Sequence, residues 1–171
     1  MNLKLVFTLL TLFGLGSPAK QPVFPPLNGI ESRQIVVVNK LKKAYTAGTS
    51  AAMLKTSFGK TKVMKEPDEV LGGNAYTYKY KGFEVYFNEK TWEAMDLTTN
   101  DHTILLDGLP ITIGDNITKL SKRFPLSYKS RKQGGIRLNI TYKGKLMDAY
   151  VSIGHNAKGV IDRIIIANDN S

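Results

Sequence analysis

The segment Ala75-Tyr-Thr-Tyr-Lys-Tyr-Lys-Gly-Phe-Glu-Val-Tyr-Phe87 decides the fold, because its apolar and polar residues alternate on both sides of Lys81-Gly82. Such alternation is typical of strands that bury one face. A tight turn at Lys81-Gly82 would also set Lys79 opposite Glu84, where opposite charges attract. Because both faces agree on one register, the segment predicts an antiparallel hairpin. Its apolar face would pair Tyr80 with Phe83, Tyr78 with Val85 and Tyr76 with Phe87.

The same alternation predicts a second hairpin around Lys143-Gly144. Lys-Gly is a weaker turn signal than Asn-Gly, because lysine tolerates a positive φ poorly. A third strand is expected after each hairpin, over 91–98 in the first case and over 160–167 in the second. The second hairpin would pair Ile140 with Met147, Leu138 with Ala149 and Ile136 with Val151.

The chain upstream of each hairpin also repeats, at a constant offset along the sequence. Thr49-Ser50 and Asp115-Asn116 are typical of residues that begin a helix. Gly59 is expected to end the first helix and Pro125 the second, since the residue before a proline avoids the helical region. Strands over 35–38 and 103–106 are expected to lead into the two helices. The aligned positions are Gly48 with Gly114, Leu54 with Leu120, and Phe58 with Phe124.

Each copy therefore predicts a strand, a turn, a short strand, a short helix and a three-strand meander. We expect an α+β protein of two tandem repeats, each a short helix packed on an antiparallel β-meander. The units would span 33–100 and 101–171. Units of this size are marginal alone, so a shared core or a continuous sheet is expected. Chance amphipathic patterning is the alternative to a true duplication.

This arrangement resembles the β-lactamase-inhibitor-protein-like fold, and it is similar to small outer-membrane assembly factors that use one such unit. The inhibitor group has a helix pair and disulfides, and the assembly factors have a lipid-attachment cysteine, whereas this chain contains no cysteine. The resemblance, over 33–168, implies a non-enzymatic, extracytoplasmic protein that binds another macromolecule. The pattern that carries it is Gly48…Leu54…Phe58-Gly59 and Gly114…Leu120…Phe124-Pro125, each followed by a meander.

The N-terminus predicts export. Lys4 precedes an apolar run over 5–15, which is shorter than the ~20 residues of a membrane span. Small residues end this run, so 1–19 is expected to be a signal peptide cleaved near Ala19, giving a periplasmic or extracellular protein with no membrane span. A buried apolar helix or an uncleaved anchor is the alternative. The proline-rich stretch 20–32 is expected to be a leader, with ordered chain beginning at Arg33.

The net charge of +10 favours an anionic partner. Nine basic residues of the second unit follow one another with no acid between them and form the candidate binding surface. A well-solvated surface without a partner is the alternative. Tyr86 and Trp92 are candidate aromatic anchors, because tyrosine and tryptophan are frequent hot spots of interfaces. The nine are Lys119, Lys122, Arg123, Lys129, Arg131, Lys132, Arg137, Lys143 and Lys145.

Catalytic and metal chemistry find little support in the sequence. His102 and His155 are far apart and near predicted turns, so we expect two surface histidines, no metal and no cofactor. A pair of acids could serve glycoside hydrolysis, although a solvated face of the meander explains them as well. The acids concerned are Glu84, Glu89, Glu93 and Asp96.

We therefore expect an exported, non-enzymatic binding module whose partner is an anionic macromolecule of the cell envelope or the exterior. Acidic proteins, envelope polymers and phospholipid head groups fit this description, and export argues against nucleic acid. Two alternatives stay open: a proteinaceous enzyme inhibitor or immunity-type protein, and a carboxylate-dependent hydrolase.

Overall fold

The structure, a computed structural model, describes residues 26–89, 91–131 and 135–168, so the expected signal peptide lies outside the described residues. An eight-stranded sheet contains β1 (Gly29–Glu31), β4 (Lys62–Pro67), β5 (Asn74–Tyr80), β6 (Phe83–Asn88), β7 (Thr91–Leu97), β10 (Gly135–Tyr142), β11 (Lys145–His155) and β12 (Ile161–Asn168). A four-stranded sheet contains β2 (Ile35–Asn39), β3 (Ala44–Thr46), β8 (His102–Leu106) and β9 (Leu109–Thr112). The helical elements are α1 (Ala51–Phe58), α2 (Pro125–Lys129) and the 3₁₀ turns η1 (Ser32–Gln34) and η2 (Ile117–Leu120).

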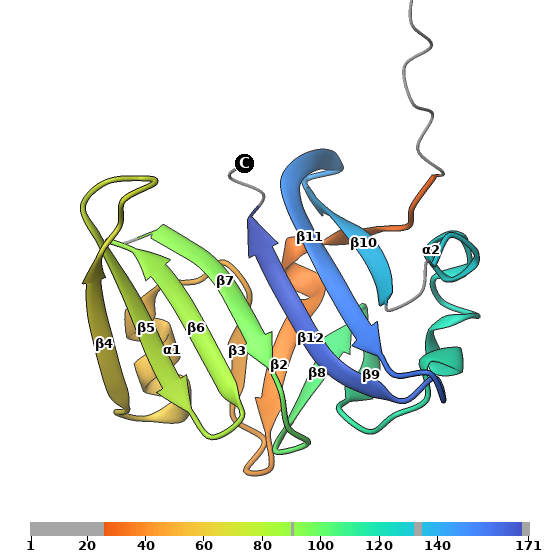
Figure 1. The fold of residues 1–171 in the computed structure, drawn as a ribbon, viewed down its shortest axis with the longest axis horizontal. Helices are drawn as coiled ribbons and strands as arrows, with labels where there is room; N and C mark the ends of the chain where they lie inside the picture. Colours follow the sequence, from red (N-terminus) through yellow and green to blue (C-terminus); the bar gives the residue numbers. More distant parts are fainter. Residues whose placement is uncertain (1–25, 90, 132–134, 169–171) are drawn as a thin grey trace, which may run out of the picture.

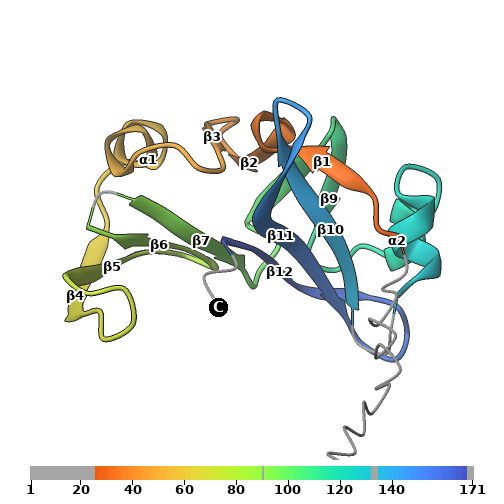
Figure 2. The same ribbon diagram turned by 90° about the horizontal axis from the view of Figure 1, so that it is seen from above.

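The two sheets lie face to face. The strand order is β1-β10-β11-β12-β7-β6-β5-β4 in the large sheet and β3-β2-β8-β9 in the small sheet. Figure 1 shows the large sheet in front, with the small sheet and α1 behind it. Figure 2, seen from above, places α1 and the small sheet on the same side of the large sheet.

The prediction of an α+β fold, with a helix packed on each meander, is wrong. The described part of the protein is mostly β, with 54% of the described residues in strands. The fully buried residue of α1 is Leu54 and that of α2 is Ser127, so the two helices contribute little of the core beside the strands. The first hairpins of the two halves, β2–β3 and β8–β9, instead pair through β2 and β8 and form the second layer.

Both sheets continue across the boundary between the two halves, as expected from their small size. The last strand of the first half, β7, pairs antiparallel with the last strand of the second, β12. One hydrophobic core lies between the layers and includes the fully buried Phe83 and Val85 of β6, Ile104 of β8 and Ile164 of β12. The halves therefore share one core, while their origin by duplication stays a prediction.

The register of the first hairpin is confirmed. Tyr80 pairs with Phe83, and Lys79 pairs with Glu84, whose carboxylate lies 3.4 Å from the lysine ammonium. Gly82 provides the positive φ of the turn at 65°. Alternation along β5 and β6 was a reliable guide here because one face of both strands is turned to the core.

The second hairpin follows the predicted register only near its turn. Thr141 pairs with Leu146 as predicted, but an irregularity follows, and Leu138 then pairs with Val151 rather than with Ala149. The prediction for Ile136 is wrong for the same reason, since its partner is Ile153. A β-bulge inserts extra residues on one strand and shifts the register beyond it.

The second helix also differs from the prediction. Asn116 begins the 3₁₀ turn η2 by accepting a hydrogen bond from the Thr118 amide at 3.0 Å. Pro125 begins α2 instead of ending a helix. Proline suits the first position of a helix, because its missing N–H would have no partner there. The first helix is as predicted, with Ser50 at its start and Gly59 at its end.

The stretch expected to be a leader contributes a strand. β1 pairs in parallel with β10. Just before it, the Asn28 side-chain oxygen accepts hydrogen bonds from the amides of Leu126 and Ser127 at 2.9 and 3.0 Å. The Asn28 amide donates to the Ser127 hydroxyl at 2.8 Å. Asn28 therefore caps α2 from far away in the sequence, where Phe124, at the N-cap position, provides no side-chain hydrogen bond.

Replacing Asn28 by alanine should lower the free energy of unfolding by about 1 to 2 kcal/mol, because two amides of α2 lose their acceptor. Asn100→Ala is the matched control, since Asn100 is exposed and hydrogen-bonds to no described residue. Urea unfolding of both variants measures the difference. Equal midpoints for the two would contradict the capping role.

Replacing Gly82 by alanine should destabilise the protein more than the same change at Gly144, its counterpart in the other Lys-Gly turn. Both glycines have positive φ, but a Cβ at Gly82 would lie 1.9 Å from the Thr99 hydroxyl, whereas nothing lies within 4 Å of a Cβ at Gly144. Gly144→Ala should cost about 1 kcal/mol for its backbone alone, and Gly82→Ala clearly more. Thermal and urea unfolding test this order, and Thr99→Gly should recover part of the additional loss.

Candidate functional site

Eight of the nine basic residues of the candidate surface are described, and they lie in three places. Lys143 and Lys145 belong to the β10–β11 turn, and Arg137 lies on β10. Lys132 lies outside the described residues. Figure 1 shows the β10–β11 turn at the top and α2 at the right edge. The remaining five lie on η2, on α2 or beside them: Lys119, Lys122, Arg123, Lys129 and Arg131.

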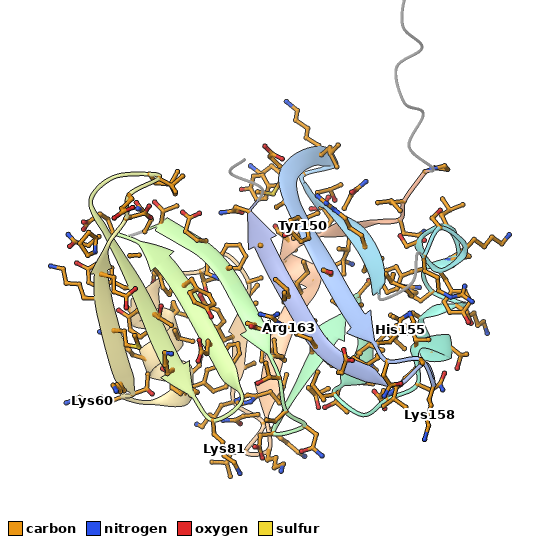
Figure 3. All side chains as sticks on the ribbon, in the orientation of Figure 1. Lys60, Lys81, Tyr150, His155, Lys158 and Arg163 are labelled. Carbon is orange, nitrogen blue, oxygen red and sulfur yellow. The ribbon has the colours of Figure 1, made fainter. Side chains whose placement is uncertain are left out.

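The turn between β11 and β12 adds one cation to this group. The Ile117 amide donates to the Gly159 carbonyl at 2.8 Å, and Asn116 forms a bridge with Val160. This packing brings the exposed Lys158 to the end of the molecule that η2 occupies, where Figure 3 labels it. No sequence pattern near Lys158 predicts this contact. We call the set Lys119, Lys122, Arg123, Lys129, Arg131 and Lys158 the basic end.

Acids compensate part of this charge. The Lys119 ammonium lies 3.0 Å from the Asp115 carboxylate, and Arg123 forms an ion pair with Asp107. Lys122, Lys129 and Lys158 form no ion pair with any described residue. These three lysines therefore carry most of the uncompensated charge of the basic end.

Arg131 is held by its neighbour. Its guanidinium lies 3.9 Å from the centre of the Tyr128 ring and donates a hydrogen bond to the Tyr128 carbonyl. An arginine that stacks on a ring keeps its charge and loses side-chain freedom. The basic end thus contains one ordered cation besides its exposed lysines.

Tyr86 lies half-buried on the outer face of the large sheet, opposite the face that α1 and the small sheet cover. Its hydroxyl donates a hydrogen bond to the Glu84 carboxylate at 2.8 Å. Burial, together with this bond and the negative charge of Glu84, raises the pKa of Tyr86 to about 12. The phenol therefore stays neutral and presents an apolar ring on this face.

Two of the candidate catalytic acids meet on the same face, directly opposite each other: Glu84 and Asp96. Each has a cationic partner. Lys79 lies 3.4 Å from Glu84, and Arg163 binds Asp96 through two nitrogens, the closer at 2.7 Å. Both acids therefore belong to a network of ion pairs on this face of the sheet.

The other two acids do not join this pair. The Glu89 carboxylate, in the turn after β6, accepts hydrogen bonds from the backbone and side-chain nitrogens of Asn74, both at 2.8 Å. Glu93 is half-buried on β7 and also has interaction partners. The four acids are therefore neighbours along the chain and not one catalytic cluster.

Trp92 faces the core instead of the solvent. β6 and β7 pair Tyr86 with Ala94 but Phe87 with Trp92, so β7 has one additional residue between the two pairs. This bulge turns the Trp92 ring to the inner face beside Phe87, and 9% of the residue remains exposed. Its Nε1 is buried and has no acceptor among the described residues.

Trp92 lines a cavity of about 480 Å³ between the two sheets. Pockets of ~300–1,000 Å³ are usual for small ligands. Apolar side chains from both layers form most of its wall, and Arg33 of η1 is the charged residue among the described residues that line it. No local sequence pattern predicts this cavity, because the residues of its wall come from segments that are far apart in the chain. Besides Trp92 and Arg33, the wall includes Ile35, Ile140, Met147 and Ala149.

The prediction of two surface histidines is wrong for His102. It is 7% exposed, and its ring packs against Phe58 and Phe83 at centroid distances of 5.6 and 5.0 Å. Burial lowers the pKa of His102, against a smaller opposite effect of the Asp101 charge. His155 is half-buried, and its Nδ1 lies 2.9 Å from the Asn156 carbonyl. Within the described ranges, no three acids or histidines gather as a metal site would require.

The free energy of unfolding should fall as the pH drops below about 6.5. A histidine whose pKa is lower in the folded protein than its ordinary value of 6.5 binds a proton on unfolding, so acid favours the unfolded chain. His102→Phe keeps the ring contacts and should flatten this dependence below about pH 6.5. His155→Gln is the control and should leave it in place. Urea unfolding at several pH values measures the free energy of unfolding of both variants. If this free energy depends on pH in His102→Phe as it does in the wild type, the dependence does not come from His102.

None of the described helices has the length and apolarity that crossing a membrane requires. No family model matches the chain, and no curated protein or solved structure is similar enough to it to count as a match.

Proposed function

We propose that this protein is an exported, non-enzymatic binding module that contacts an anionic macromolecule of the cell envelope or the exterior through its basic end. The observation that carries the proposal is the position of Lys122, Lys129 and Lys158 at one end of the molecule, where they form no ion pair with any described residue. A local excess of positive charge accelerates the encounter with an anionic partner and orients it.

Two further observations support a binding role. Glu84 and Asp96 are held in ion pairs with Lys79 and Arg163, so both carboxylates belong to a side-chain network of the outer face. Arg131 is ordered by Tyr128, so part of the positive surface loses little freedom when it binds a partner. The segment with α2 is itself fixed by Asn28. The basic end is therefore a positioned surface and not a loose tail.

The alternative of an enzyme inhibitor rests on Tyr86. Tyr86 alternates along β6 with the buried Val85 and Phe87, so its ring lies on the face away from the core, and tyrosine is a common anchor of protein interfaces. Trp92 is buried and would not serve as a second anchor on this face. Such a complex would depend on packing more than on charge.

Changing Lys122, Lys129 and Lys158 together to glutamine should weaken binding to heparin, used as a polyanionic probe. The matched control changes Lys43, Lys60 and Lys62, which are exposed, form no ion pair with a described residue and lower the net charge equally. Figure 3 shows Lys60 at the end opposite Lys158. The basic-end variant should elute at a clearly lower salt concentration than the control variant, because local charge sets the salt dependence.

If the two variants elute at the same salt concentration, the basic end has no specific role, and net charge alone accounts for the binding to heparin. A stoichiometric complex with an enzyme that survives high salt and is lost in Tyr86→Ala would favour the inhibitor alternative instead.

A further inference from the structure

We propose that the cavity between the two sheets binds a small amphipathic molecule that has a single apolar chain and an anionic head group. The site is separate from the basic end, and the inference does not depend on the function proposed above. Its wall combines Ile35 of the small sheet with Trp92, Ile140 and Ala149 of the large sheet, all at most 9% exposed. An apolar wall of this kind favours an apolar ligand body.

Two irregularities of the large sheet meet at this cavity. The β6–β7 bulge turns Trp92 to the inner face, and the β10–β11 bulge leaves Met147 beside Ala149 at the wall. Asn168, which pairs with Ala149, donates a side-chain hydrogen bond to the Trp92 carbonyl at 2.9 Å and joins the two regions. Bulges re-aim side chains and are frequent beside binding sites.

The positive charge of Arg33 favours a ligand whose head group is negatively charged. It is exposed on η1, lines the cavity and forms no hydrogen bond or ion pair with any described residue. The nearby Glu31 already accepts hydrogen bonds from the Gly144 amide and the Thr141 hydroxyl, which lower its pKa, with Arg33 contributing less. A guanidinium without an acceptor at an apolar cavity fits a carboxylate or a phosphate.

Trp92 lines the cavity, although its Nε1 is itself buried and has no hydrogen-bond partner among the described residues. Trp92 is also the single tryptophan of the chain, so its fluorescence reports on the occupancy of this cavity alone.

The test is a titration of the full chain with dodecanoate below its critical micelle concentration, followed by Trp92 fluorescence and by native mass spectrometry. Dodecanol provides the same chain without the charge, and dodecyltrimethylammonium provides it with the opposite charge. We expect a one-to-one complex with dodecanoate, weaker binding of dodecanol and the weakest binding of the cation. Dodecyl phosphate should also bind, because it has the same apolar chain and an anionic head group. The ratio of the two affinities shows whether the site prefers a phosphate or a carboxylate.

Two variants separate the chain site from the head-group site. Ala149→Phe fills the cavity and should abolish binding of both dodecanoate and dodecanol. Arg33→Gln is a surface change that should not affect folding. It should weaken the affinity for dodecanoate about tenfold and leave the affinity for dodecanol unchanged. Lys60→Gln, at a distant exposed site, should change neither.

The proposal is overturned if wild-type protein shows no saturable complex with dodecanoate, or if Arg33→Gln binds it as well as Lys60→Gln does. Loss of heparin binding in the basic-end variant would not affect this outcome, because that variant keeps Arg33 and the cavity wall. The two proposals therefore fail independently.

Discussion

The antiparallel pairing of β7 with β12 is the contact on which the rest of the structure depends. It sets Leu97 opposite Ile164 and Met95 opposite Ile166 in the middle of the eight-stranded sheet, and all four side chains are fully buried. Each half alone would have a small sheet with an incomplete core, which is marginal for stability. The pairing of β2 with β8 completes the second layer in the same way, from one strand of each half.

Local alternation was sufficient to predict β5, β6 and their register, because Tyr78 and Phe83 belong to strands with one face in the core. It could not predict how hairpins from the two halves combine, since the pairing of β2 with β8 joins segments that are far apart in the chain. The bulges were equally hidden, because an inserted residue such as Glu93 has no local signature. The fold class was wrong for this reason: the small sheet took the place that the helices were expected to fill.

The candidate sites show the same division between local and distant information. The basic run was visible in the sequence, but its eight described members separate in space, and Lys158 joins the basic end through the contact of Gly159 with Ile117. The cavity had no sequence signal, since Arg33 and Trp92 come from distant parts of the chain and share a wall only after both sheets form. A charge run therefore marks a surface, whereas a site between layers needs the fold.

Parallel pairing of β1 with β10 has a consequence for the order in which the chain can fold. Gly29 pairs with Asn139, so β1 can join the large sheet only when most of the polypeptide is available. Contacts of such sequence separation slow folding, because a long loop must close before they form. During synthesis, β1 therefore has no partner in the large sheet until β10 has been made. The pairing of these two strands closes a loop of most of the described chain.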